Sequence, residues 1–246
     1  MPDAISDKVA LVTGGSTGIG AAICQHLIDE GYEVLSLARR TQPSSTPRLR
    51  GVAVDLSDAA ATRQVAQELA AAHPITTIVH NAGAIREKPL DEVTDADLSA
   101  LTQLHVGTAI ALVQANLATM RARRFGRIVL VSTRAVLGLA QRTVYSATKA
   151  GLIGLARTWA LELAPAGITV NVVAPGPIAD TEMFHELVPR DSDRLARIER
   201  AVPVGRLGMP DDVARAVAFF AAPQSGFITG QTLFVCGGTS VGSISF

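Results

Sequence analysis

The sequence has few of the features that mark secreted, metal-binding or nucleic-acid-binding proteins. Its 246 residues include only two cysteines, Cys24 and Cys236, which lie far apart and form no CxxC pair. This spacing argues against a zinc site or a redox dithiol, so we expect no metal, and it suits a reducing compartment. The 22 basic and 22 acidic residues cancel, and no long basic block occurs. We therefore expect neither nucleic acid nor an anionic membrane as a partner.

Long apolar segments are scarce as well. The stretch MPDAISDKVALVTGG lacks the basic region and apolar core of a signal peptide. No apolar run reaches the roughly 18 residues that span a bilayer. These features predict a soluble, cytoplasmic protein. The hydrophobic content of 48%, with no internal repeat and no interdomain linker, predicts one domain over residues 1–246.

Short apolar bursts alternate with helical patterns along most of the chain. This alternation predicts an α/β fold with a seven-stranded parallel sheet and helices on both faces. Strands buried on both faces read as continuous runs of Val, Ile and Leu, as most of these bursts do. The expected strands are 8–13, 33–38, 51–55, 76–80, 127–132, 168–174 and 232–235, and the expected helices are 18–30, 58–72, 95–122, 144–163 and 211–221.

Two connections differ from the others. The segment RRTQPSSTPRLR at 39–50 holds two prolines and small polar residues, so no helix is expected between the second and third strands. The longer segment at about 179–210 mixes helix-forming residues with proline and glycine. A polar insertion of this kind after a strand predicts a lid over a ligand crevice.

The segment LVTGGSTGIGAAI follows the first expected strand and opens the first expected helix. Gly14, Gly18 and Gly20 let the backbone turn sharply and approach a pyrophosphate closely. The helix N-terminus then offers free N–H groups and a partial positive charge. This context predicts dinucleotide binding, and Ser16 and Thr17 of the same loop belong to the predicted site.

The end of the second expected strand predicts which dinucleotide binds. An acid about 20 residues past the glycine loop normally holds the ribose 2′-hydroxyl of NAD. Here that position is Ala38, followed by Arg39 and Arg40. A neutral residue beside two guanidinium groups attracts a 2′-phosphate, so NADP(H) is favoured over NAD(H). The alternative, that both arginines are ordinary surface charges, stays open.

Three further motifs accompany the glycine loop: NAG at 81–83, YSATK at 145–149 and VNVVAPGP at 170–177. Together, in this order and across nearly the whole chain, the four motifs resemble those of the short-chain dehydrogenase/reductase family. The resemblance implies a Rossmann-type, doubly wound domain, usually a homodimer or homotetramer. It also implies hydride transfer between NAD(P)(H) and a carbonyl or secondary alcohol.

The resemblance implies roles for individual residues. Tyr145 resembles the general acid/base of the family, and Lys149 its partner. The implied cofactor-binding positions are Ile19 in the pyrophosphate loop, Asp55 and Leu56 near the adenine, Asn81, Ala82 and Gly83 on the adenosine side, Pro175, Gly176 and Ile178 around the nicotinamide, and Tyr145 and Lys149 themselves.

Tyr145 and Lys149 also form a sensible chemical pair. They are four residues apart in an expected helix, so they share one face. A tyrosine with a pKa of about 10 holds its proton too tightly to cycle near neutrality, and a cation within about 4–6 Å lowers that pKa. The competing interpretation is a packed tyrosine beside a lysine that extends to solvent.

Several positions depart from the family pattern. The catalytic hydroxyl is Ser132 by its spacing from the tyrosine, or Thr133 by strand register; we prefer Thr133 and retain both. His105 stands where the family usually has an asparagine whose carbonyl holds a water. An imidazole there could join the proton relay or serve the structure. Thr17 replaces a basic residue frequent in NADP-binding members, and Cys236 replaces an aspartate.

Three functions compete. The first is an NADP(H)-dependent carbonyl reductase or secondary-alcohol dehydrogenase for a substrate of small to medium size. The second is 3-oxoacyl-(acyl carrier protein) reductase: Arg124 matches one arginine of the carrier-binding pair, but Ala166 stands where the second is expected. The third is a non-catalytic sensor that binds NADP(H). The departure from the family pattern at His105 is the reason to consider it. Specificity is expected in the lid and in the loop at 134–143.

Overall fold

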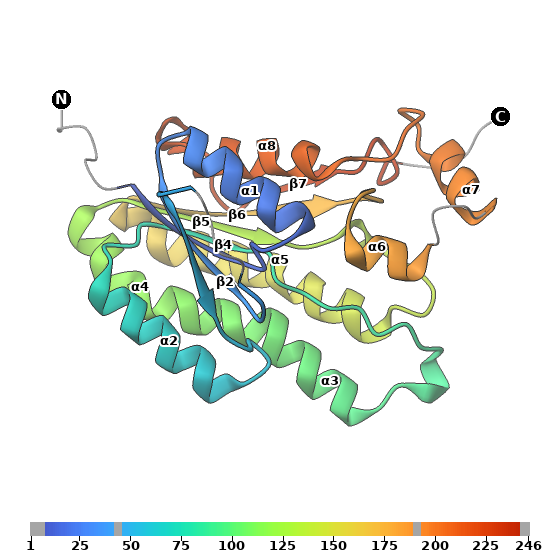
Figure 1. The fold of residues 1–246 in the computed structure, drawn as a ribbon, viewed down its shortest axis with the longest axis horizontal. Helices are drawn as coiled ribbons and strands as arrows, with labels where there is room; N and C mark the ends of the chain where they lie inside the picture. Colours follow the sequence, from blue (N-terminus) through green and yellow to red (C-terminus); the bar gives the residue numbers. More distant parts are fainter. Residues whose placement is uncertain (1–7, 42–45, 189–192, 242–246) are drawn as a thin grey trace.

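The structure is a computed structural model that describes residues 8–41, 46–188 and 193–241. At its centre lies a parallel sheet of seven strands in the order β3-β2-β1-β4-β5-β6-β7 (Figure 1). The strands are β1 (Val9–Thr13), β2 (Glu33–Ala38), β3 (Leu49–Ala53), β4 (Thr77–His80), β5 (Gly126–Val131), β6 (Ile168–Pro175) and β7 (Thr232–Val235). The predicted doubly wound, Rossmann-type sheet is confirmed.

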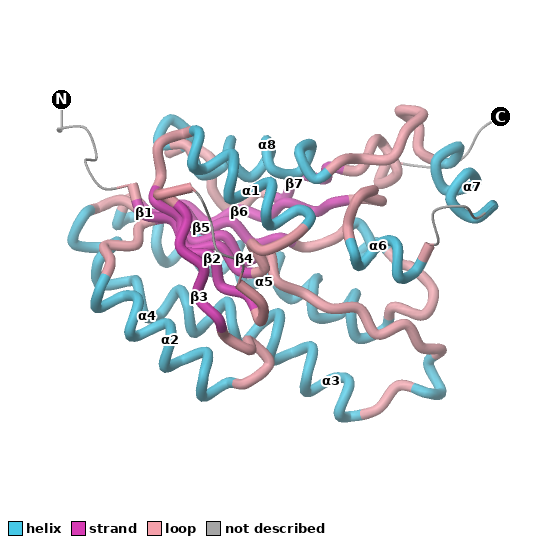
Figure 2. Tube along the Cα trace, viewed as in Figure 1, coloured by secondary structure: helices cyan, strands magenta, loops and turns pink. Residues whose placement is uncertain are grey.

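The sheet is covered on both faces because its strand side chains alternate between two apolar cores. In β1, Leu11 belongs to one core and Val12 to the other. Helices α2 (Ala59–Ala72), α4 (Thr108–Arg123) and α5 (Thr143–Leu163) complete the first core, and α1 (Gly18–Asp29) and α8 (Pro210–Ala221) the second (Figures 1 and 2).

The strand order changes direction at β1. The chain first adds β2 and β3 on one edge of β1, and then adds β4 to β7 on the other edge. In an open α/β sheet, ligands bind beyond the carboxyl ends of the strands at such a reversal. The glycine loop after β1 and the NAG turn after β4 both lie there. The fold therefore brings these two motifs together, although they are more than 60 residues apart in the chain.

The helical segment predicted over 95–122 is not α-helical throughout. The structure has α3 (Asp95–Thr102), a π-helical turn η2 (Gln103–Gly107) and then α4. The N–H of Thr108 donates to the carbonyl of Gln103, five residues earlier, so one extra residue enters the turn. The prediction of a helical segment over 95–122 is confirmed by the continuous helical run Asp95–Arg123, but apolar spacing did not reveal the single inserted residue. The insertion buries His105 completely.

The run Asp95–Arg123 is long and apolar enough, by length and composition, to cross a membrane. In the fold several of its large apolar side chains line the protein interior: Leu101, Leu112 and Met120 are fully buried, whereas Leu98 is 49% exposed. The run packs against α2 and α5. A core helix passes the same test of length and composition, and packing against the sheet accounts for the apolar residues here.

The predicted lid contains two short helices, α6 (Glu182–Leu187) and α7 (Asp193–Ala201), beyond the carboxyl ends of the strands (Figure 1). Residues 189–192 of the predicted lid lie outside the described residues. An isolated bridge pairs Ile178 with Gly208, so the entry and exit of the lid meet. In the connection between β2 and β3, the described residues 39–41 and 46–48 hold no helix.

Candidate functional site

The glycine loop after β1 is shaped for close approach of a ligand to the backbone. Gly14 and Gly18 have φ values of +67° and +52°, which favour glycine. A Cβ on Gly20 would collide with the carbonyl oxygen of Gly14. The N-cap Thr17 makes no side-chain cap bond, so the first N–H groups of α1 are available to an anion. Ser16 and Thr17 are exposed, and Ile19 is half-buried. The loop therefore fits a dinucleotide pyrophosphate.

The NAG turn is tied to the same loop by Thr13 at the end of β1. The Thr13 Oγ1 accepts the backbone N–H groups of Asn81 at 3.0 Å and Ala82 at 2.9 Å. The Asn81 side chain donates to the Thr13 carbonyl at 3.2 Å. Space for a side chain at Gly83 is tight, because a Cβ there would lie 3.2 Å from the Lys149 Nζ. These contacts hold the turn between the glycine loop and α5.

The two arginines after β2 are exposed and face different acids. Arg40 lies 3.3 Å from Glu182, the first residue of α6. The charge of Arg39 acts on Asp55, whose pKa is lowered mainly by hydrogen bonds from the Ser57 hydroxyl and N–H. The Leu56 side chain is buried in the core, so a contact of Leu56 with adenine would use its backbone.

Tyr145 lies on α5 in a small apolar cluster with Ala84 of the loop after β4 and Ala135 of the loop after β5. Its ring is 8% exposed. Burial raises the pKa of Tyr145, while a hydrogen bond with the Thr133 side chain and the charge of Arg142 oppose the rise. The net shift is opposite to the one predicted from the Tyr145–Lys149 spacing, because burial of the phenol dominates.

Ser132 and Thr133 point to different partners because they are consecutive residues at the end of β5. The Ser132 hydroxyl is buried and donates to the Lys149 carbonyl at 2.8 Å. The Thr133 oxygen accepts the Ala135 N–H at 3.1 Å, which leaves its proton free to donate. Of the two hydroxyls, only that of Thr133 acts on Tyr145, whose pKa it lowers. The geometry therefore favours Thr133 over Ser132 as the substrate-facing hydroxyl.

Lys149 is 2% exposed, and its ammonium donates to the Val131 carbonyl at 2.7 Å. No carboxylate among the described residues forms an ion pair with it. Burial lowers the pKa of Lys149 to about 7. A buried cation without a counter-ion destabilises a protein, which makes Lys149 a candidate functional group.

His105 enters the same region from the π-helical turn. Its ring is 5.8 Å from the Tyr145 ring, edge to face, and its Nδ1 is 2.8 Å from the Thr148 Oγ1. Burial and the charge of Lys149 lower the pKa of His105 to about 2. The ring is therefore neutral at physiological pH.

The segment predicted to surround the nicotinamide begins where β6 ends. Pro175 pairs with Val235, and a Cβ on Gly176 would lie 2.8 Å from the Cα of Cys236. Ile178 is buried and lines a cavity of about 280 Å³. The cavity wall is Pro177, Ile178, Val202, Val204, Arg206, Gly208, Asp212, Phe234, Val235, Cys236 and Gly237. Tyr145 does not belong to this wall.

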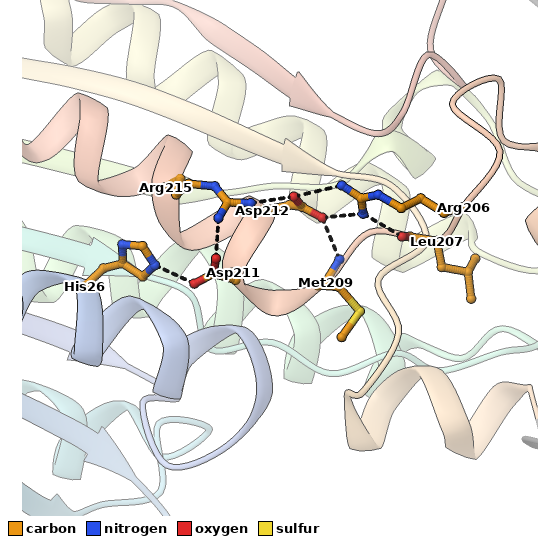
Figure 3. Close-up of polar contacts among 7 residues, drawn as sticks. All are labelled: His26, Arg206, Leu207, Met209, Asp211, Asp212 and Arg215. Atoms are coloured by element: carbon orange, nitrogen blue, oxygen red, sulfur yellow. Dashed lines mark hydrogen bonds and ion pairs between the residues drawn. The ribbon is translucent and has the colours of Figure 1, made fainter.

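A charge network anchors the lid exit to α8 (Figure 3). Asp212 accepts two bonds from Arg206, at 2.7 and 3.1 Å, and one from the Met209 N–H at 2.8 Å. Arg215 bonds both Asp212 and Asp211, and Asp211 also contacts His26 of α1 at 2.5 Å. The first turn of α8 is thus joined to the lid on one side and to α1 on the other.

Sequence reasoning missed several residues of this site. His80 is fully buried below the NAG turn. Glu87 was also missed: it pairs at 3.1 Å with Arg142, a 5%-exposed residue of the loop at 134–143 that was predicted to set specificity, and the pair joins the two loops beside Tyr145. Thr148 could have been identified from the sequence, because it lies inside the YSATK motif. No sequence pattern connects Glu87 with Arg142. Among the described residues, no group of three or more His, Cys, Asp or Glu side chains could hold a metal.

Comparison with known proteins gives consistent matches over the whole chain. The profile of a family described as enoyl-(acyl carrier protein) reductase matches residues 14–240. A subunit of (2S)-[(R)-hydroxy(phenyl)methyl]succinyl-CoA dehydrogenase from Thauera aromatica is 37% identical, with 96% of this chain and 98% of that protein covered. The 3-oxoacyl-[acyl-carrier-protein] reductase of Escherichia coli is 36% identical, with 94% and 96% covered.

Solved structures agree with these matches. An oxidoreductase of the short chain dehydrogenase/reductase family from Burkholderia thailandensis superposes with a TM-score of 0.89 at 31% identity, covering 97% of this chain and 94% of that chain. A blue fluorescent protein from a metagenomic library, solved in complex with NADPH, superposes with a TM-score of 0.83 at 33% identity, covering 95% and 98%.

Proposed function

This chain belongs to the short-chain dehydrogenase/reductase family of oxidoreductases, and we propose that it uses NADP(H) to interconvert a ketone and a secondary alcohol of small to medium size. One observation carries the proposal. Tyr145 is a buried phenol whose rise in pKa is opposed by the Thr133 side chain, and it lies one helical turn from the buried Lys149, which forms no ion pair with a carboxylate of the described residues. A binding-only protein has no need for this arrangement.

The chain's own residues supply the proton chemistry. As negative charge develops on the ketone oxygen, Tyr145 transfers its phenolic proton to that oxygen. The free O–H of Thr133 donates a second hydrogen bond to the same atom and orients it. Lys149 then stabilises the phenolate, whose charge in turn favours the protonated amine. When bound, the nicotinamide supplies the hydride that reduces the carbonyl carbon, or accepts it in the reverse direction.

The cofactor would be held by the loop 14–20 and by the NAG turn, with the pyrophosphate at the N-terminus of α1. Arg39 and Arg40 are exposed beyond β2, where guanidinium groups would bind a 2′-phosphate. The NADPH complex of the metagenomic relative is in keeping with this choice. NADP(H) is therefore proposed in preference to NAD(H).

The decisive experiment replaces Tyr145 with phenylalanine. Turnover of a panel of ketones should fall by about 10²–10⁴-fold, the usual contribution of a general acid. NADPH affinity, measured by fluorescence titration, should change by less than about threefold, because the hydroxyl is not needed to hold the dinucleotide. Wild-type activity retained in Tyr145→Phe would reject the acid/base role. NADPH binding without turnover of any ketone by the wild type would instead favour the sensor.

A second candidate is 3-oxoacyl-(acyl carrier protein) reductase, because several of the similar proteins carry that name. Arg124 is exposed, and its guanidinium donates to the Pro165 carbonyl at 3.2 Å. Ala166 adds no charge beside it. Comparing kcat/KM for a 3-oxoacyl-carrier thioester with that for a free ketone separates the two functions, and Arg124→Ala should lower only the former.

Self-association is the further partner that we propose. Leu161 near the end of α5 is 82% exposed, and Phe227 after α8 is fully exposed. Large apolar side chains on the surface favour a second copy of the chain as partner. Light scattering behind a sizing column should give a dimer or tetramer, and Leu161→Lys should shift the mass toward the monomer if α5 forms the contact.

A further inference from the structure

His105 occupies a space between the cofactor side of the site and the catalytic helix. The π-helical turn directs its ring toward the loop after β4 and toward α5. Its Nε2 accepts the backbone N–H of Ala84 at 3.3 Å. Its Nδ1 is 2.8 Å from the hydroxyl of Thr148. One side chain therefore connects two elements that carry predicted site residues.

The partners of the ring determine which nitrogen carries the proton. The N–H of Ala84 can only donate, so Nε2 must be unprotonated. The Thr148 hydroxyl has one proton, which it donates to the Val144 carbonyl at 2.8 Å. Thr148 therefore accepts from His105, and the proton is on Nδ1. All hydrogen-bonding groups of the ring and of the Thr148 hydroxyl are consistent with this neutral tautomer.

The ring also limits the space around the Lys149 ammonium. A Cβ placed on Gly83 would lie 3.1 Å from the His105 Nε2 and 3.2 Å from the Lys149 Nζ. The ring and the ammonium thus both lie against Gly83. If the ring moved, Gly83 would lose one of these two neighbours, and the Lys149 ammonium would be held by the Val131 carbonyl alone.

The titratable groups that face the ring work against its protonation. Lys149 is a cation beside it, and the charge of His80 would act in the same direction. His80 is itself neutral: the Thr13 Oγ1 accepts two backbone N–H groups and so donates its proton to the His80 Nδ1 at 2.9 Å. Tyr145 is in edge-to-face contact and buried. None of these groups offers the ring a negative counter-charge at neutral pH.

We propose that His105 is a positioning residue whose neutral, Nδ1-protonated imidazole joins Ala84 to Thr148 and thereby fixes Gly83 against the Lys149 ammonium. The role rests on the proposed function, because it acts through Lys149. It differs from membership in a proton relay, in which the ring would gain and lose a proton during turnover.

The first test reads the tautomer directly in the unmodified chain. In protein labelled with ¹⁵N-histidine, the His105 ring, assigned by comparison with His105→Gln, should show a protonated Nδ1 and a bare Nε2 from pH 5.5 to 8.5. Titration of the ring within that range, or protonation of Nε2, would overturn the proposal. This readout requires no substrate, so it is independent of whether the proposed reaction is correct.

The second test reads the consequence for catalysis. His105→Phe keeps a ring of similar size but removes both nitrogens, and Thr148→Val removes the other partner. Each should lower kcat by about 10- to 100-fold, as small displacements of a catalytic group do, with substrate KM changed less than threefold. The double variant should be no worse than the poorer single variant, because both remove one connection. Additive losses would contradict a shared role.

The pH profile distinguishes positioning from relay. Thr148→Val and His105→Gln should show the same number of ionisations in kcat as the wild type. Loss of one ionisation on replacing His105 would identify a relay and reject the proposal. If His105→Phe does not fold, Thr148→Val and the ¹⁵N spectra still decide the question. If Tyr145→Phe keeps activity, the proposed function fails while the tautomer measurement stands.

Discussion

The guanidinium of Arg40 and the carboxylate of Glu182 are 3.3 Å apart, although 142 residues separate them in the chain. Arg40 follows β2 at the predicted 2′-phosphate position, and Glu182 begins the first lid helix. Both side chains are largely exposed, at 77% and 59%, so the pair itself adds about 0–1 kcal/mol of stability. The pair matters for cofactor binding, because the Glu182 carboxylate would compete with a 2′-phosphate for the Arg40 guanidinium.

Replacing Glu182 with glutamine should therefore tighten NADP(H) binding by up to about fivefold. Binding of the phosphate no longer has to break the Arg40–Glu182 pair, which contributes at most about 1 kcal/mol. NAD(H) binding should not change, because NAD lacks the phosphate. Fluorescence titration of both dinucleotides measures the two constants. Glu186→Gln, an exposed change on the same helix, is the matched control. Equal shifts for the two dinucleotides would contradict the competition.

Thr133 and Ser132 should respond differently to loss of their hydroxyls. Thr133→Val removes the donor beside Tyr145 and should lower kcat by about 10²–10³-fold, the cost of losing one oxyanion donor. Ser132→Ala removes a buried bond to the Lys149 carbonyl and should cost about 1 kcal/mol of folding stability while leaving kcat within a few-fold. Steady-state kinetics and thermal melts measure the pair, and the opposite ranking would reassign the hydroxyl to Ser132.

Lys149 should destabilise the cofactor-free fold. Its pKa is about 7 in the folded protein because of burial, below its value of 10.5 when unfolded. Between these values the unfolded chain binds the additional proton, so stability should rise with pH from about 7 toward 9.5. Lys149→Met should remove this dependence and raise Tm at pH 7, by about 2–4 °C for each kcal/mol recovered. A Tm that is lower or unchanged in Lys149→Met would argue against a penalised ammonium.

The buried histidines should make the protein sensitive to mild acid. Burial lowers the pKa of His80 to about 3 and that of His105 to about 2, from 6.5 in the unfolded chain. As the pH falls below 6.5, these histidines bind protons in the unfolded state but stay neutral in the folded state. The free energy of unfolding therefore decreases by about 1.4 kcal/mol per pH unit for each histidine.

Urea unfolding between pH 6.5 and 5 measures this slope, in a range above the titration of the carboxylates. His80→Asn should halve it, because one of the two buried histidines is then removed. An unaltered slope in His80→Asn would mean that this ring is protonated in the folded state.

Asp212 should control the lid through Arg206. Its carboxylate has a pKa well below the usual range, chiefly because of the Arg206 guanidinium. Asp212→Asn weakens that contact, so the lid exit should loosen, and substrate KM should rise about 3- to 10-fold with a smaller effect on kcat. Asp211→Asn is the matched control, since it contacts His26 and Arg215 and not Arg206. A larger KM effect from Asp211→Asn would place the anchor elsewhere.

The architecture was readable from the chain because it depends on local patterns. Continuous Val, Ile and Leu runs predict strands buried on both faces, and alternating side chains then feed two cores. The glycine loop is equally local: positive φ at Gly14 and Gly18 and the crowding at Gly20 explain why these positions are glycine. The spacing of Tyr145 and Lys149 likewise places them on one helical face.

What remained required contacts between distant segments. A shift of one residue decides whether Ser132 or Thr133 meets Tyr145, and only the register of β5 against its neighbours resolves that shift. The pairing of Arg40 with Glu182 depends on the fold bringing the lid next to the end of β2. The burial of His105 in the π-helical turn and the net rise in the pKa of Tyr145 depend on which groups packing removes from water. Local periodicity carries no record of that removal, so tertiary structure alone decides it.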